Sequence, residues 1–302
     1  MSGDTVVNPW VRAVRLQYYP TTGLVLLVGI SVSAFVGIVF TMGIVWMVAA
    51  NVLLHCACSL INEYRDFVSG ADLVEYPESG WSATGGSGVL REQLLPPRQV
   101  LSVSVVLVCV SWAIWLVLGY KIDYWIILFM SGALLVTYLY SAAVSAGGFY
   151  YYREVALSLG SVPLVVISVV KVLTAVYSVA ALAAGIIIGM QILIYLLYHG
   201  IVDLDSDSES GKLRISVVLG REKTRMVSRG LLICMVLAVT GLAYKGILPQ
   251  FSMSVAVLLP AAVLIMWKEK RQSPMRTYNQ IVLLLGAAAG LLCSGYWVHL
   301  LL

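Results

Sequence analysis

Residues 61–72 read INEYRDFVSGAD and come directly after a long apolar run. Asn62 and Asp66 lie four residues apart, so on a helix they share one face. The Ser-Gly pair before Asp72 loosens the chain and allows Asp72 to turn back toward that face. We therefore expect three oxygen-bearing side chains to meet where a membrane-spanning helix ends.

A second apolar run ends at His199-Gly200 and is followed by Asp203, Asp205 and Asp207. Asp203 and Asp207 share a helical face, whereas Asp205 points away from it. Carboxylates this close repel one another, and the repulsion is costly beside a low-dielectric membrane unless a cation lies between them. Mg²⁺ favours carboxylates together with substrate phosphates. The two acidic ends predict a diphosphate held between them through Mg²⁺.

The composition indicates a polytopic membrane protein. The 302 residues are 60% hydrophobic and 11% charged, with a mean hydropathy of +0.93, whereas soluble domains are about 25% charged. All five cysteines lie in apolar runs and lack Cys-x-x-Cys spacing, which favours buried small side chains over a zinc site. The first apolar run lacks a cleavage pattern and is interpreted as a retained span.

Nine apolar segments have about the 20 residues that a membrane span needs. They are residues 18–38, 41–62, 99–119, 122–144, 154–173, 176–199, 224–244, 251–267 and 279–302. The predicted fold is all-α: one domain, residues 1–302, with nine transmembrane helices around a central cavity.

Charge is distributed unequally between the two sides of this predicted bundle. All but Lys121, Lys171 and Lys245 of the 19 Lys and Arg residues fall on one side. All but Asp123 of the 15 Asp and Glu residues fall there as well. The positive-inside rule places that side, with the N-terminus, in the cytoplasm, and the odd span count places the C-terminus opposite.

Two long polar segments, about 63–98 and 200–223, belong to the cytoplasmic side and are expected to form a cap of two loops. Arg91 in the first loop and Lys212 and Arg214 in the second are candidates for contact with a polyanion. Simple membrane anchoring explains basic residues at these places equally well.

Aromatic side chains are a further candidate group, because their electron-rich faces stabilise cations in apolar cavities. Tyr138, Tyr140 and Tyr195 lie near the cytoplasmic ends of the fourth and sixth predicted spans. Tyrosines also mark membrane interfaces in general. The sequence leaves both interpretations open.

Taken together, these residues resemble the UbiA superfamily of intramembrane prenyltransferases over nearly the whole chain. The stretches NEYRDFVSGAD at 62–72, GGSGVLREQLLPPRQV at 85–100 and DLDSD at 203–207 are similar to the 1,4-dihydroxy-2-naphthoate polyprenyltransferases of menaquinone synthesis. The resemblance implies Mg²⁺-dependent prenyl transfer from a prenyl diphosphate to an aromatic, naphthoate- or quinone-precursor-like acceptor. It also implies residence in a lipid bilayer, expected to be a prokaryotic cell membrane, and no nucleic-acid partner.

The resemblance also implies roles for individual residues. Asn62, Asp66 and Asp72 correspond to the first Mg²⁺–diphosphate motif, and Asp203 and Asp207 to the second, with Asp66 and Asp203 catalytic.

Three further residues are candidates, two through the resemblance and one through a departure from it. Arg91 and Lys212 match positions where the family keeps basic residues near the diphosphate. Where the family usually has an Asn-containing pair before the second acidic run, this chain has His199-Gly200. A neutral histidine donates or accepts a hydrogen bond and can take up a proton near neutral pH, so His199 is a candidate catalytic residue.

Two alternative functions remain open. A membrane terpene cyclase or lyase would carry out the same ionisation without an acceptor, with His199 accepting a proton. A transporter would couple its acidic residues to ions. The acidic residues lie at span ends on one side, and no inverted repeat is visible, which disfavours a transporter.

Overall fold

The computed structural model describes residues 8–37, 42–70, 87–141, 152–209, 211 and 213–301. All regular elements in this part of the chain are helical. In order they are α1 (Pro9–Ala13), η1 (Leu16–Tyr18), α2 (Tyr19–Val36), α3 (Gly43–Ser69), α4 (Pro97–Ile122), α5 (Tyr124–Ser141), α6 (Arg153–Val155), the π-helical η4 (Ala156–Ser161), α7 (Val162–Thr174), α8 (Val179–Val202), α9 (Leu204–Glu209), α10 (Ile215–Tyr244), η5 (Gln250–Leu258), α11 (Leu259–Lys268), η6 (Glu269–Arg271) and α12 (Pro274–Leu301).

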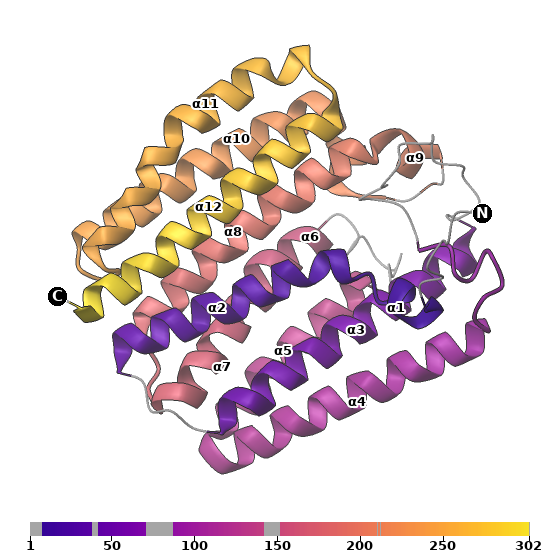
Figure 1. Cartoon of the computed structure of the whole chain (residues 1–302), viewed down its shortest axis with the longest axis horizontal. Coiled ribbons are helices and arrows are strands. Elements are labelled where there is room, and N and C mark those ends of the chain that lie inside the picture. Colours follow the sequence, from indigo (N-terminus) through magenta and orange to yellow (C-terminus); the bar gives the residue numbers. More distant parts are fainter. Residues whose placement is uncertain are drawn as a thin grey trace, which may run out of the picture.

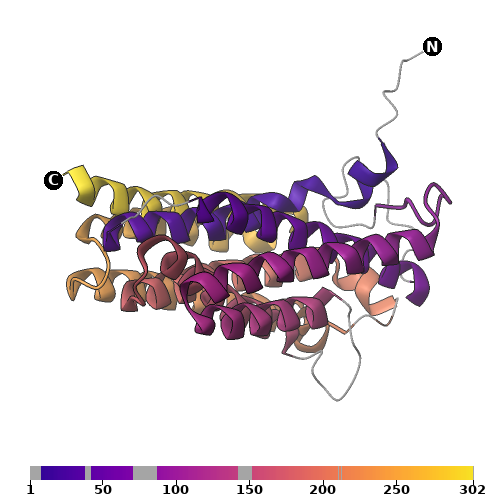
Figure 2. The same ribbon diagram turned by 90° about the horizontal axis from the view of Figure 1, so that it is seen from below.

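Nine helical segments of the described chain are long and apolar enough to cross a membrane, which confirms the prediction of an all-α, nine-span protein. Three of them combine several elements: Pro9–Val36 (α1, η1 and α2), Arg153–Thr174 (α6, η4 and α7) and Gln250–Lys268 (η5 and α11). The spans run side by side along the molecule (Figure 2). α1, α9 and the end of α3 lie at one end of the bundle, and the end of α12 lies at the other (Figure 1).

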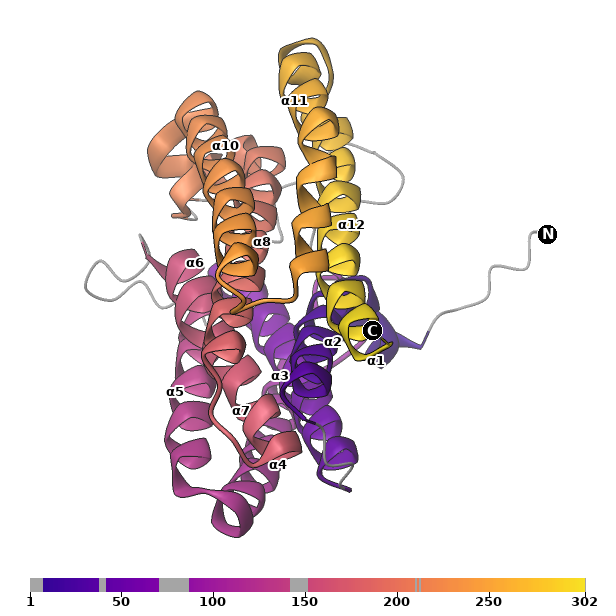
Figure 3. The ribbon, with the colours of Figure 1, turned by 90° about the vertical axis from the view of Figure 1, so that its left-hand side faces the viewer.

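α8 lies at the centre of the bundle. It packs against α2, α7, α10 and α12, and 61% of its most apolar window is buried, compared with 17% for the η5–α11 span. Figure 3 shows α10, α11 and α12 to one side of the bundle and α4, α5 and α7 to the other. α8 therefore separates two groups of helices.

Glycines allow α8 to approach α7 and η4 closely. A Cβ atom added at Gly185 would lie 2.7 Å from the Cα atom of Pro163, and one added at Gly189 would overlap the Ser158 carbonyl oxygen. Because these neighbours are backbone atoms, no side-chain rotation would relieve the overlap. The π-helical turn is therefore held directly against α8, and π-helical turns are frequent at functional sites.

Part of the predicted cap of two loops is helical in the structure, whereas residues 87–96 form no regular element. α3 continues to Ser69, and α8 continues to Val202, so the membrane-facing helices extend beyond their apolar residues. α9 and the start of α10 fill most of the segment 200–223. The cap prediction treated the change to polar residues as the end of each helix. That change marks only the end of the apolar span, and the backbone hydrogen bonds of α3 and α8 continue past it.

Of the first predicted loop, residues 87–96 are described between the masked part and α4. Val89, Leu90 and Leu95 are buried in a small cluster with Ala13 of α1 and Leu60 of α3. These apolar contacts hold the segment against the flank of the bundle.

Candidate active site

A cavity of about 280 Å³ opens between α2, α3, α5, η4, α7 and α8. None of its lining residues comes from α10, α11 or α12, so the cavity lies to one side of the bundle's centre. Asn62 and Asp66 line it from α3, and Asp203 and Asp207 line it from the chain after α8. The structure thus places the two acidic ends that the sequence singled out at one cavity.

In the first acidic group, Asn62 and Asp66 are in direct contact. The Asn62 Nδ2 atom donates a hydrogen bond of 3.1 Å to Asp66 Oδ2, as their spacing of one helical turn allows. Asp66 is buried, at 7% exposure. Asp72, the third residue of this predicted group, lies outside the described residues.

In the second acidic group, a guanidinium lies between two buried carboxylates. Arg214 Nη1 is 3.4 Å from Asp203 Oδ2, and Arg214 Nε is 3.1 Å from Asp207 Oδ2. Burial acts to lower the pKa of Arg214, but the charges of Asp207 and Asp203 outweigh it and raise that pKa above its ordinary value. Lys212, the predicted basic residue of this segment, lies outside the described residues.

Gly200 explains how Arg214 reaches this position. A Cβ atom added at Gly200 would overlap the Ser216 hydroxyl and lie 3.0 Å from Ser216 Cβ. The first turn of α10 therefore packs directly onto the backbone of α8. Gly200 allows this contact because it has no side chain.

Arg15 is a second basic residue at the cavity, and it was not singled out from the sequence. Its backbone is left-handed, with φ of 53°, at the start of η1. Arg15 Nη2 donates to Glu63 Oε2 over 2.9 Å, and the backbone N–H of Ser87 donates to the same oxygen over 3.0 Å. We call the end of the cavity lined by Asp66, Asp203 and Asp207 the acidic end. The residues that balance its charge are far apart in the sequence.

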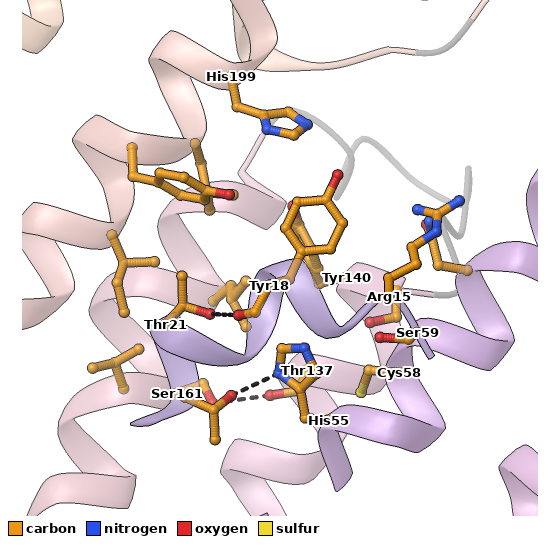
Figure 4. Close-up of a pocket in the computed structure, with 18 of the residues that line it drawn as sticks. Arg15, Tyr18, Thr21, His55, Cys58, Ser59, Thr137, Tyr140, Ser161 and His199 are labelled. Carbon is orange, nitrogen blue, oxygen red and sulfur yellow. Dashed lines mark hydrogen bonds between the residues drawn. The ribbon is translucent and has the colours of Figure 1, made fainter. Parts of the chain in front are cut away.

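His199 lies within a group of tyrosines at the acidic end. Its ring centroid is 6.1 Å from Tyr18, 5.9 Å from Tyr195 and 5.8 Å from Tyr278. His199 Nε2 is 3.2 Å from Asp203 Oδ2. Figure 4 shows the ring of Tyr18 below His199, with its hydroxyl group directed toward that end. Tyr18 and Tyr278 were not singled out from the sequence, because only tyrosines at the ends of the fourth and sixth predicted spans were considered.

The other predicted residues divide into two groups. Tyr140 and Tyr195 line the cavity, whereas Tyr138 does not and is 39% exposed. Residues two positions apart on a helix point in different directions, so Tyr138 and Tyr140 do not face the same space. Arg91 lies on the segment 87–96 and is not among the lining residues.

The chemistry of the described donors suits Mg²⁺ shared with a substrate. Asn62, Asp66, Asp203 and Asp207 offer only oxygen ligands, from one amide and three carboxylates. No three His, Cys, Asp or Glu side chains among the described residues are grouped closely enough to hold a metal alone. Mg²⁺ is typically bound by one or two carboxylates together with phosphate oxygens.

Comparisons with known proteins identify relatives of the chain. The sequence profile described as the UbiA prenyltransferase family matches residues 18–286. A comparison with curated proteins finds no match.

Solved structures match over nearly the whole chain. A UbiA homolog from Archaeoglobus fulgidus bound to DMAPP and Mg²⁺ has 14% identity, with 96% of this chain and 99% of that chain covered at a TM-score of 0.67. The apo UbiA homolog from Aeropyrum pernix K1 has 14% identity, with 93% and 98% covered at 0.66. A digeranylgeranylglyceryl phosphate synthase has 11% identity, with 96% of each chain covered at 0.65. At these identities the likeness shows the fold.

Proposed function

Because the chain belongs to the UbiA prenyltransferase family, we propose that it transfers a prenyl group from a prenyl diphosphate to an aromatic acceptor in a Mg²⁺-dependent reaction. One observation carries this proposal: Asp66 lines the same cavity as Asp203 and Asp207, although more than a hundred residues separate them in the sequence. The Archaeoglobus fulgidus homolog with this fold was solved with DMAPP and Mg²⁺, which supports the same donor class here.

In this proposal the acidic residues hold the metal–diphosphate group. Asn62, Asp66, Asp203 and Asp207, together with Asp72, would bind Mg²⁺, which neutralises charge on the leaving diphosphate as the allylic C–O bond breaks. Their oxygen atoms set the end of the cavity at which the diphosphate is held.

Basic and aromatic residues complete the proposed site. Arg214 would donate hydrogen bonds to diphosphate oxygens, since its guanidinium already lies among the carboxylates that would bind the metal. Lys212 and Arg91 are proposed as further contacts on the basis of the resemblance. The aromatic faces of Tyr140 and Tyr195 would stabilise the allylic cation, by about 0.5–2 kcal/mol each.

A naphthoate- or quinone-precursor-like compound is the acceptor class that we propose. The support is the similarity of residues 62–72 and 85–100 to the menaquinone branch of the family. Electrophilic attack of the allylic cation on an electron-rich ring forms the new C–C bond, and the ring then loses a proton.

A membrane terpene lyase or cyclase is the second candidate, and the surroundings of His199 favour it. The Nδ1 atom of His199 is buried and has no hydrogen-bond partner among the described residues. Three tyrosine rings surround the same imidazole. In a lyase, His199 would take a proton from the carbon next to the cation, and the released product would be a hydrocarbon.

The proposal is tested with purified protein in lipid nanodiscs, supplied with Mg²⁺ and a panel of prenyl diphosphates, with and without 1,4-dihydroxy-2-naphthoate. Mass spectrometry is expected to detect a prenylated acceptor. We expect Asp66→Ala and Asp203→Ala to lower the rate at least ~100-fold, because each removes a charged ligand that acts on the leaving group. Asp123→Asn, at the opposite end of the bundle, is the matched control.

Each outcome of this assay separates the candidates. Hydrocarbon release from the prenyl diphosphate alone, with no prenylated acceptor, would favour the lyase. Full activity in both acidic variants would remove the basis for either enzyme.

A further inference from the structure

The cavity has two chemically different walls. The wall formed by η4, α7 and α8 is mainly apolar, with Leu157, Val162, Val165, Ile192 and Leu196. The wall formed by α2, α3 and α5 carries polar side chains, among them Thr22, Asn51, His55, Cys58 and Thr137. Polar groups at membrane depth are costly and commonly mark a functional path or site. Asn51 and Thr137 already donate to backbone carbonyl groups of their own helices, so the second wall offers further polar contacts that an apolar prenyl chain would not use.

The polar wall follows one face of α3 into the membrane-spanning part of the protein. Asn51, His55, Cys58, Asn62 and Asp66 all line the cavity and are spaced by three or four residues. His55 lies eleven residues before Asp66, which corresponds to about 16 Å along the helix axis. A group bound at His55 is thus distant from the proposed diphosphate position.

His55 is held in place by two neighbours. Its Nδ1 atom forms a hydrogen bond of 2.7 Å with the Thr22 hydroxyl, and the Tyr19 ring lies against it at a centroid distance of 4.3 Å. Its other ring nitrogen, Nε2, has no hydrogen-bond partner among the described residues. Figure 4 shows His55 at the opposite end of the drawn pocket from His199.

These contacts favour an uncharged hydroxyl group as the ligand. Neutral histidine has one donor and one acceptor nitrogen, and the Thr22 hydroxyl accommodates either tautomer. The Nε2 atom therefore either donates or accepts, and a hydroxyl group suits both cases. A carboxylate only accepts, and it would need a cation beside it. The cationic lining residues, Arg15 and Arg214, lie at the acidic end, where carboxylates already pair with them.

We infer that Thr22, His55, Cys58 and Thr137 form a deep polar subsite that binds an uncharged hydroxyl group of the acceptor, with His55 as its positioning residue. The inference rests on the proposed function. The prenyl chain then lies along the apolar wall, and the acceptor ring extends from the deep polar subsite toward the acidic end. The protein would select acceptors by a hydroxyl group remote from the reacting carbon.

The test measures binding by titration calorimetry, with the protein in nanodiscs and empty nanodiscs as the blank. The probes are 1,4-dihydroxynaphthalene, kept under argon, and 1,4-dimethylnaphthalene, a compound of similar shape with neither a donor nor an acceptor group. We expect the dihydroxy compound to bind the unmodified protein at least ~10-fold more tightly than the dimethyl compound. His55→Phe and Thr22→Val should weaken binding of the dihydroxy compound by about that factor and leave binding of the dimethyl compound unchanged. His55→Gln, which keeps a donor and an acceptor, should restore part of the affinity.

Two controls keep this result specific. His299→Phe changes a histidine that contacts Phe35 at the other end of the bundle, and it should bind both probes as the unmodified protein does. The Kd of geranyl diphosphate with Mg²⁺ should be the same in all these variants, which also shows that they are folded.

Three results would contradict one or the other proposal. Equal binding of the two probes by the unmodified protein, or unchanged discrimination in both His55→Phe and Thr22→Val, would overturn the deep polar subsite alone. Failure of the unmodified protein to bind Mg²⁺ and geranyl diphosphate would instead overturn the proposed function.

Discussion

At the scale of single residues, the acidic end is defined by how its charges are balanced. Arg214 lies between Asp203 and Asp207, and the Gly200 backbone leaves the space that allows it to do so. An unpaired buried carboxylate is strongly unfavourable. Arg214 therefore stabilises the two acids in the free protein and is available to contact an anion brought to the same place.

Arg214→Gln is expected to raise the KM for a prenyl diphosphate about 10–100-fold, because a charge-assisted hydrogen bond of about 1.5–3 kcal/mol is lost. Its affinity for Mg²⁺ without substrate should increase, since no guanidinium then competes for the two carboxylates. Steady-state kinetics and Mg²⁺ titration measure the two effects.

The matched control for this prediction is Arg221→Gln. Arg221 pairs with Asp205, whose side chain is 78% exposed, and such surface pairs contribute little. An equal change of KM in both variants would show that Arg214 attracts the diphosphate only through its positive charge and makes no specific hydrogen bond to it.

At the scale of elements, ion pairs connect the least buried span, η5–α11, to α10. Arg225 and Arg229 of α10 contact the two carboxylate oxygens of Glu269 in η6, at 2.9 and 2.6 Å. The Glu269 side chain is only 1% exposed. This ion-pair group connects the end of the η5–α11 span to α10, where apolar packing is sparse.

Glu269→Gln is expected to lower the free energy of unfolding by about 3 kcal/mol, because it leaves the buried Arg225 without its full counter-charge. Thermal unfolding in nanodiscs, followed by circular dichroism, measures the change. Glu222→Gln is the matched control: it removes another carboxylate 2.9 Å from Arg225, but one whose side chain is 63% exposed. A similar loss in both variants would count against a special role for the buried carboxylate.

At the scale of the whole molecule, the sequence predicted the arrangement of helices better than the contents of the site. Apolar run length determines span number, and the spacing of Asp66, Asp203 and Asp207 along the chain placed all three at one end of the bundle. The sequence did not indicate Arg15 as a cavity residue, since its partner Glu63 comes close only through folding. Polar residues at a helical period inside an apolar run, such as His55, were the available indication of the polar wall.

The orientation of the molecule in its membrane is predicted to place the acidic end in the cytoplasm. We expect a cysteine at Glu209 to react with a membrane-impermeant maleimide only after the cells are permeabilised. A cysteine at Lys121, at the other end of the bundle, should react in intact cells. Both substitutions are made in a background with all five native cysteines replaced by alanine. The reverse labelling pattern would overturn the orientation.

The position of the cavity on one flank of α8 has a consequence for how this protein can change. Substitutions on that flank are expected to change which ligands the cavity holds. On the flank facing α10 and α12, away from His199 and Gly200 at the acidic end, they are expected to change mainly the stability of the protein. Ligand selectivity and protein stability thus depend largely on different surfaces of a single helix. Mutation, in the laboratory or in evolution, can change one of these properties and leave the other largely intact.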